Sequence, residues 1–176
     1  YIPFDATTDT IDTSLLPTII DGLVYCPGSI NLRPFKGIKP EAFETDLQIN
    51  FISLVKVIQS VLPNLLASEQ ASIVTFSSVA ASMGMPFHTS VSAAKGAIEG
   101  FAKALAAEYA PKIRVNVIAP SLTDTPLADK FLNNETKQEK SAERHPLKRF
   151  GKPEDSAQMA TFLLSDKSSW ISGQIF

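Results

Sequence analysis

Short apolar runs alternate along this chain with longer stretches of helical periodicity, and this alternation restricts the fold more than any other feature. Strands that alternate with helices in sequence form parallel sheets whose two faces are both covered by helices. We therefore expect an α/β protein with a doubly wound parallel sheet in three layers, α/β/α. The expected strands are residues 21–26, 72–77 and 113–119, and the expected helices are residues 40–66, 90–110 and 153–164.

The length of the chain and its lack of linkers indicate one domain. The 176 residues are enough to bury a sizeable core, and they contain no internal repeat, low-complexity tract or linker. Residues 1–4 have the pattern of a strand end, and the sequence stops in mid-pattern at residues 174–176. We expect a single domain over residues 1–176 that is an incomplete view of a longer one. Residues 133–144 are polar and are expected to form a mobile excursion.

Composition argues against several classes of function. The chain has 16 basic and 18 acidic residues, so no basic excess suggests a nucleic acid or an anionic membrane as partner. No uninterrupted apolar run reaches membrane-spanning length, and residues 1–10 lack the pattern of a signal peptide. The single cysteine, Cys26, cannot form an internal disulfide, and no Cys/His group has metal-site spacing. These features favour a cytoplasmic protein without a metal.

One serine and one lysine stand out by their spacing. Ser78 ends an expected strand, and Lys95 follows seventeen residues later within an expected helix. Ligands of open α/β sheets bind outside the carboxyl ends of the strands, where Ser78 falls. Alone, Ser78 could simply satisfy local backbone groups, and Lys95 could be a solvated helix residue. The pair at this spacing, in a helix rich in small residues, favours a functional site.

This segment resembles the active-site segment of the short-chain dehydrogenase/reductase family. There a strand-end serine is followed by Tyr-x-x-x-Lys, with the tyrosine thirteen residues after the serine. Ser78 and Lys95 match in register, whereas Val91 stands at the position of the tyrosine. The resemblance implies a Rossmann-like fold that binds NAD or NADP. It also implies an oxidoreductase that acts on a small-molecule carbonyl or alcohol.

Further matches extend the resemblance over nearly the whole chain. Asp5 and Ala6 resemble the Asp-Val pair that touches adenine in the family. Gly28 ends a Tyr-Cys-Pro-Gly run where the family has Asn-Asn-Ala-Gly beside the adenine ribose. Pro120 begins a Pro-Ser turn where the family has Pro-Gly beside nicotinamide, and Thr125 matches the threonine that bonds the carboxamide. The resemblance therefore implies that these five residues contact the cofactor.

The resemblance also assigns the handling of the substrate oxygen and its proton. Ser78 would polarise the oxygen, Lys95 would hold the nicotinamide ribose and tune the local proton affinity, and Asn50 would anchor a water. Val91 has no proton to give, and a positioned general acid typically contributes about 10²–10⁴-fold in rate. His88, three residues earlier, is a candidate substitute because histidine titrates in a suitable range. The alternative is that His88 is a polar residue of the loop before the helix.

Two functions remain open from the sequence. The first is an NAD(P)-dependent oxidoreductase, favoured by the retained serine, lysine and asparagine. The second is a non-catalytic member of the family, a nucleotide-sensing or structural subunit, favoured by the missing tyrosine. No G-x-x-x-G-x-G turn for a pyrophosphate occurs in the sequence, and we expect it to precede residue 1. The residues that distinguish NAD from NADP are expected in the same upstream part.

The expected helix over residues 90–110 carries two glycines, Gly96 and Gly100, although each costs about 1 kcal/mol relative to alanine. Such residues indicate that another backbone approaches closely. Tight packing within the monomer is one interpretation. In the family, this helix and the preceding long one commonly form a subunit interface. We expect a homodimer or homotetramer formed through residues 40–66 and 90–110.

Overall fold

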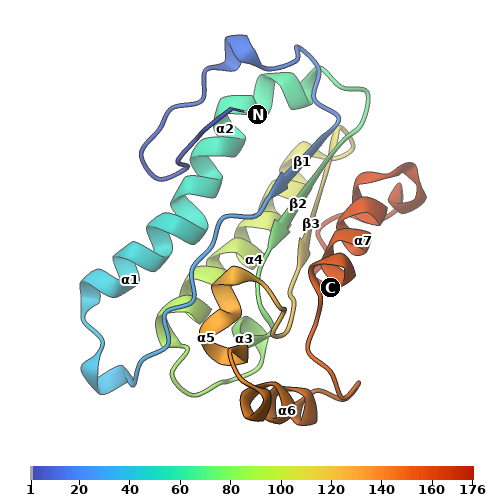
Figure 1. Cartoon of the computed structure of the whole chain (residues 1–176). Helices are drawn as coiled ribbons and strands as arrows, with labels where there is room; N and C mark the ends of the chain where they lie inside the picture. The colour runs from blue at the N-terminus through green and yellow to red at the C-terminus, as the bar shows by residue number, and fades with distance from the viewer. Residues whose placement is uncertain (1) are drawn as a thin grey trace.

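The computed structural model describes residues 2–176, and at its centre lies a parallel three-stranded sheet (Figure 1). The strands are β1 (Gly22–Tyr25), β2 (Ala71–Phe76) and β3 (Ile113–Ile118), and they lie in the order β1-β2-β3. Ile175, near the end of the chain, adds a single parallel bridge to Val117 of β3. All three strands therefore end at the same edge of the sheet, as the sequence predicts for a parallel α/β fold.

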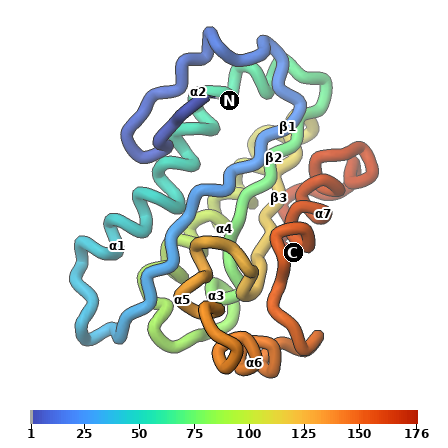
Figure 2. Tube along the Cα trace, in the orientation of Figure 1, coloured from blue at the N-terminus to red at the C-terminus, as the bar shows by residue number. Residues whose placement is uncertain are grey.

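Helices cover both faces of this sheet, so the three predicted layers are confirmed (Figures 1 and 2). One face carries a continuous helical stretch from α1 (Pro40–Leu47) through a π-helical turn (Gln48–Ile52) to α2 (Ser53–Leu66), together with α4 (Thr89–Tyr109). The other face carries α7 (Pro153–Leu164). The shorter helices are α3 (Val79–Ser82), α5 (Asp129–Leu132) and α6 (Glu135–Arg144), with 3-10 turns at Thr13–Leu15, Phe35–Gly37, Pro126–Ala128 and Asp166–Ser168.

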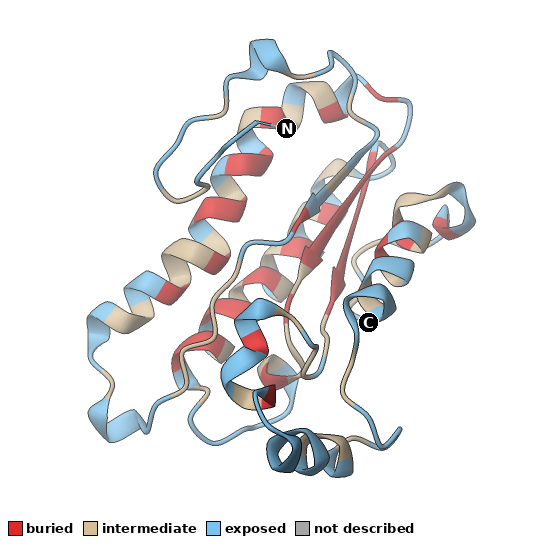
Figure 3. Ribbon diagram, viewed as in Figure 1, coloured by how far each residue is buried: buried red, intermediate tan, exposed pale blue. Residues whose placement is uncertain are grey.

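The core lies between the sheet and the layer formed by α2 and α4 (Figure 3). β2 and β3 are apolar runs that are buried along almost their whole length, as expected for strands covered on both faces. Phe51 of the π-helical turn packs against Phe101 of α4, with ring centroids 5.6 Å apart in an edge-to-face arrangement. α4 ends at Tyr109, shortly before Pro111, which has no backbone N–H to continue the helix. This packing fixes the direction in which α4 presents its first turns.

Two expectations about the chain were wrong. Residues 135–144 form helix α6 rather than a mobile excursion. Asn134 caps this helix by accepting a hydrogen bond from Lys137 N, and none of its residues is buried. Helical periodicity of apolar residues could not reveal a helix that has no apolar face. Residues 2–4 form no strand, and Tyr1 lies outside the described residues.

The helical stretch from α1 to α2 is apolar as well as long. Over Pro40–Leu66 it is long and apolar enough to cross a membrane by length and composition alone. The expectation that no apolar run reaches this length is therefore qualified. A core helix of a globular protein passes the same test, and α2 buries Leu54, Ile58 and Leu65 against the rest of the fold.

Candidate active site

Lys95 is the most unusual charged group in the molecule. Its side chain extends from α4 to the carboxyl end of β2, where Nζ donates a hydrogen bond to Phe76 O at 2.9 Å. Only 8% of the residue is exposed, and no carboxylate within residues 2–176 forms a salt bridge with it. Removal of the ammonium from water lowers the pKa of Lys95 from 10.5 to about 8. Near neutral pH this amine is therefore a cation that can give up its proton readily.

Gly28 and Asn50 lie beside the Lys95 amine. A Cβ atom placed on Gly28 would lie 3.3 Å from Lys95 Nζ and 3.2 Å from Asn50 Oδ1. Asn50 is fully buried in the π-helical turn, a type of turn that is common at functional sites. The structure thus brings together three residues that the sequence placed on three separate elements. The sequence did not predict the π-helical turn that positions Asn50.

A buried carboxylate stands behind this group. Asp46 is 2% exposed, and it accepts hydrogen bonds of 2.6 Å from Ser29 Oγ and from Ser90 Oγ. Asn50 Nδ2 donates to Ser29 Oγ and to the Asp46 carbonyl, both at 2.8 Å. These bonds tie the loop after β1, the long helix and the start of α4 to one another. Sequence reasoning missed Asp46, although its position one helical turn before Asn50 could have indicated it.

Ser78 lies at the end of β2, as predicted, and is partly exposed. It is the N-cap of α3, and its Oγ accepts a hydrogen bond from Ala80 N at 3.2 Å. This bond matches the structural interpretation of the residue and still leaves the hydroxyl its proton to donate. Val79 N donates to Pro120 O at 3.2 Å, so the segment after β2 lies against the turn after β3. The structure therefore joins two of the segments that carry predicted site residues.

Val91 and His88 occupy the start of α4. Val91 is 5% exposed and lies one turn before Lys95 on the same helix. His88 is the residue that precedes the helix, and its Nδ1 lies 2.7 Å from Pro86 O. Because a carbonyl only accepts, Nδ1 must carry the proton in this bond. The ring is thus engaged by the loop before α4.

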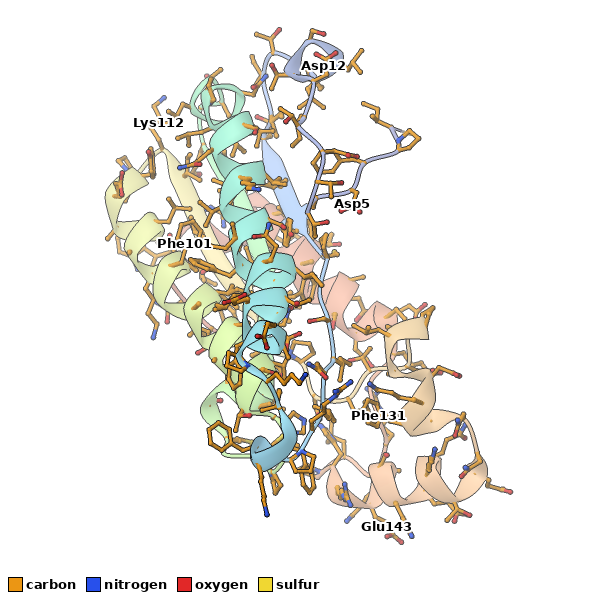
Figure 4. The ribbon with its side chains drawn as sticks, turned by 90° about the vertical axis from the view of Figure 1, so that its left-hand side faces the viewer. Asp5, Asp12, Phe101, Lys112, Phe131 and Glu143 are labelled. Atoms are coloured by element: carbon orange, nitrogen blue, oxygen red, sulfur yellow. The ribbon has the colours of Figure 1, made fainter. Side chains whose placement is uncertain are left out.

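The remaining predicted cofactor residues fall into two groups. The side chain of Thr125, which precedes the 3-10 turn Pro126–Ala128, makes one weak bond, from Oγ1 to Thr123 O at 3.5 Å. Pro120 helps to line a cavity of about 240 Å³ beside β3, whose lining includes neither Lys95 nor Gly28. Asp5 and Ala6 are not brought to this group. The carboxylate of Asp5, which is labelled in Figure 4, is bonded by Thr7 within its own turn, and this bonding lowers the pKa of Asp5. Ala6 lines a small pocket against α2.

Comparison with known proteins decides the family. Residues 4–176 match the family model described as enoyl-(acyl carrier protein) reductase, one of the short-chain dehydrogenase/reductase models. The chain belongs to the short-chain dehydrogenase/reductase family. The Rossmann-like fold inferred from the sequence is thereby confirmed.

Individual relatives agree with this assignment. The chain is 38% identical over 157 residues to the 3-oxoacyl-[acyl-carrier-protein] reductase of Thermotoga maritima, covering 89% of this chain and 63% of that protein. It is 33% identical over 156 residues to the L-xylulose reductase of Bos taurus, covering 88% of this chain and 64% of that protein. A solved short-chain type dehydrogenase/reductase of Mycobacterium ulcerans superposes with a TM-score of 0.84 at 30% identity. That match covers 93% of this chain and 60% of the other. The chain thus spans less than two thirds of these relatives.

Proposed function

We propose that this chain contributes the catalytic half of an NAD- or NADP-dependent oxidoreductase, which interconverts a small-molecule carbonyl and its alcohol. The observation that carries the proposal is the buried ammonium of Lys95 beside Gly28 and Asn50 at the carboxyl end of β2. Burial of a cation without a counter-ion in direct contact destabilises a fold. Perturbed titratable groups of this kind gather at functional sites.

The residues present fit the nicotinamide half of a dinucleotide. Gly28 leaves a space beside Lys95 and Asn50 that any Cβ would fill, so a ligand can approach the backbone there. An ammonium has three donors, and one of the three donors of Lys95 is bound to Phe76 O. Of the other two, one is suited to a ribose hydroxyl and one remains for the substrate oxygen. Thr125, with its single weak bond, has capacity for a carboxamide. The choice between NAD and NADP stays open.

The chain's own residues would handle the oxygen and its proton. A bound reduced nicotinamide would supply the hydride to the carbonyl carbon. Ser78 would donate its hydroxyl hydrogen to the carbonyl oxygen and polarise the bond. Because Val91 has no proton to give, we assign the proton to the ammonium of Lys95, which becomes a neutral amine and regains its proton from water. The products are then the alcohol and the oxidised cofactor.

His88 is a weaker candidate for the proton donor. Its ring is already bound to the loop carbonyl of Pro86, and it precedes α4 instead of sharing a helical face with Val91. We therefore treat His88→Ala as a control, with an expected change in rate of less than about twofold.

A second candidate function rests on one observation, the apolar side chain at Val91. A non-catalytic subunit would keep the fold and the cofactor contacts and would lack turnover. The buried lysine favours the enzyme instead, because a sensor needs no amine with a depressed pKa. We further propose a cytoplasmic location and self-association through α1, α2 and α4. These two proposals are independent of the chemistry.

The test is an assay of NADH and NADPH oxidation with a panel of ketones, ketoses and 3-oxoacyl thioesters. Calorimetry measures cofactor binding in parallel. The proposal predicts turnover with at least one carbonyl class, and it predicts that Lys95→Met binds cofactor without measurable turnover. A folded protein that binds NADH or NADPH and reduces no carbonyl would leave the non-catalytic function in place.

A further inference from the structure

Asp46 is a buried carboxylate that the proposed reaction does not use. It is 2% exposed, and both of its oxygens are occupied by serine hydroxyls, Ser29 on Oδ1 and Ser90 on Oδ2. Two hydroxyl donors fit an ionised carboxylate, which only accepts. No lysine, arginine or histidine in the part of the chain that the structure describes forms a salt bridge with it. A lone buried anion and a lone buried cation thus lie in the same layer of the fold.

We propose that Asp46 is the counter-charge of Lys95 and that it sets the proton affinity of the amine through the polar path formed by Ser29 and Asn50. The role of Asp46 in proton delivery rests on the proposed oxidoreductase function. The electrostatic coupling between Asp46 and Lys95 does not depend on that function.

The path between the two charges is short and polar. Asp46 accepts from Ser29 Oγ at 2.6 Å, and the same hydroxyl accepts from Asn50 Nδ2 at 2.8 Å. The other end of that amide, Oδ1, faces the point beside Gly28 that Lys95 Nζ also faces, at 3.2 and 3.3 Å. The path from Asp46 thus runs over two hydrogen bonds and one amide group to the point beside Gly28 that Lys95 Nζ faces. In a buried region, where the dielectric constant is low, two unit charges that are not in direct contact still interact appreciably.

The other charged groups around the pair are poorly placed to take this role. Glu99 follows Lys95 by one turn of α4, but its carboxylate is bound by Ser77 Oγ at 2.6 Å and is partly exposed. Arg114 of β3 is bonded to the end of α7 and to the residue that follows it, through Leu163 O at 2.8 Å and Ser165 O at 3.2 Å. Glu41 and Glu44 of α1 are exposed, and His88 is held by Pro86 O. Asp46 is thus the buried anion that hydrogen bonds connect to the surroundings of Lys95.

The ionised carboxylate favours the charged form of Lys95 and opposes the effect of burial. Without it, the amine would lose its proton at lower pH, and less of the proton donor would exist near neutral pH. The hydroxyl of Ser29 links the carboxylate to the amide, because it donates to Asp46 and accepts from Asn50. Asp46 is therefore a positioning residue that acts through Lys95.

The experiment follows the pKa of Lys95 directly, by the ¹³Cε shift of selectively labelled lysine as a function of pH. Lys95→Arg identifies the resonance. Asp46→Asn keeps the shape and removes the charge, and one of the two serine hydroxyls must then accept from the amide instead of donating. The substitution should lower the pKa of Lys95 by roughly half a unit to one unit. Glu44→Gln is the matched control, since it makes the same charge change on an exposed position of the same helix. It should leave the pKa of Lys95 unchanged.

Several outcomes would overturn the inference. One is a pKa of Lys95 that is equal in the unaltered protein and in Asp46→Asn. Another is a shift that arises in Glu99→Gln and not in Asp46→Asn. If Asp46→Asn does not fold, the unaltered protein can still test the inference. The ¹³Cγ chemical shift of Asp46 should then change as Lys95 loses its proton. A ¹³Cγ shift that does not change would refute the coupling.

A measurement of activity against pH distinguishes this inference from the proposed function. The rate of carbonyl reduction should decline at lower pH in Asp46→Asn than in the unaltered protein. If Asp46→Asn turns over with an unchanged pH profile, the inference is contradicted and the proposed function is not. Absence of turnover contradicts the proposed function, and the lysine titration still gives its own result.

Discussion

Two charged sites in this molecule are built in opposite ways. Lys95 is 8% exposed and has no carboxylate in salt-bridge contact within residues 2–176, and burial lowers its pKa to about 8. Arg149 and Asp155 form a bidentate pair at 2.6 and 2.9 Å at the start of α7, with side chains 50% and 44% exposed. Hydrogen bonds from Arg149 lower the pKa of Asp155 to about 2.

The two sites contribute to stability with opposite signs. The folded-state pKa of Lys95 lies below its unfolded value, so the ammonium destabilises the fold below about pH 8, and this penalty is relieved between about pH 8 and 10.5. The folded-state pKa of Asp155 also lies below its unfolded value, so the surface pair stabilises the fold near neutral pH. That contribution is lost as the pH falls from about 4 to 2. The exposed pair therefore stabilises the fold, whereas the buried amine is retained although it destabilises the fold.

Among the substitutions that test this comparison, Lys95→Met has the largest expected effect. Loss of the amine should abolish carbonyl reduction. The same change should raise the free energy of unfolding at pH 7 by about 1–3 kcal/mol, because the pKa change of Lys95 corresponds to about 3 kcal/mol and Phe76 O loses a donor. Activity assays and urea denaturation measure the two effects. A variant that loses both activity and stability would show that the lysine supports the fold.

Val91→Tyr sharpens the comparison by giving the buried amine a phenol as neighbour. The two positions are four residues apart on α4, so the side chains lie on one face. The rate of carbonyl reduction should rise, up to the general-acid contribution of about 10²–10⁴-fold, if the pocket admits the larger ring. Steady-state kinetics on the variant measures the gain, with Val91→Phe as the matched control for volume. A gain equal to that of Val91→Phe would refute proton donation by the phenol.

The outward face of α4 offers a smaller effect that does not involve the site. A Cβ at Gly96 or Gly100 would meet nothing within 4 Å among the described residues, so tight packing within the monomer does not explain these glycines. If this face is a subunit interface, Gly100→Arg should convert the oligomer to a monomer and leave the fold intact. Sedimentation at micromolar concentration measures the state. An unaltered protein that sediments as a monomer would contradict the proposed interface.

The smallest effect is expected at the exposed pair. Arg149→Ala should lower the melting temperature by no more than about 1–2 °C at pH 7 and should leave the rate of reduction unchanged, because exposed ion pairs contribute little. The difference from the unaltered protein should vanish near pH 2, where Asp155 gains its proton. Differential scanning calorimetry at both pH values checks this. A large loss of melting temperature at neutral pH would contradict the comparison, because the exposed pair would then contribute far more to stability than exposed ion pairs do.

Much of the fold could be predicted from the sequence, because the apolar runs of β1, β2 and β3 and the long periodic helices carry strong local signals. The polar helix α6 could not be predicted, since its stability comes from a cap and from solvent-facing polar residues instead of an apolar face. In the site, the order of Ser78, Val91 and Lys95 was visible in the sequence. The Asp46 network was not, because it joins residues from three elements that only packing brings together.

The pH dependence of carbonyl reduction by the unaltered protein tests the central claim most directly. If the ammonium of Lys95 delivers the proton, the rate under saturating cofactor should fall as the pH rises through about 8, where the amine loses its charge. The decline should disappear together with all turnover in Lys95→Met. A rate that stays level from pH 7 to 10, in a folded protein saturated with cofactor, would contradict the account.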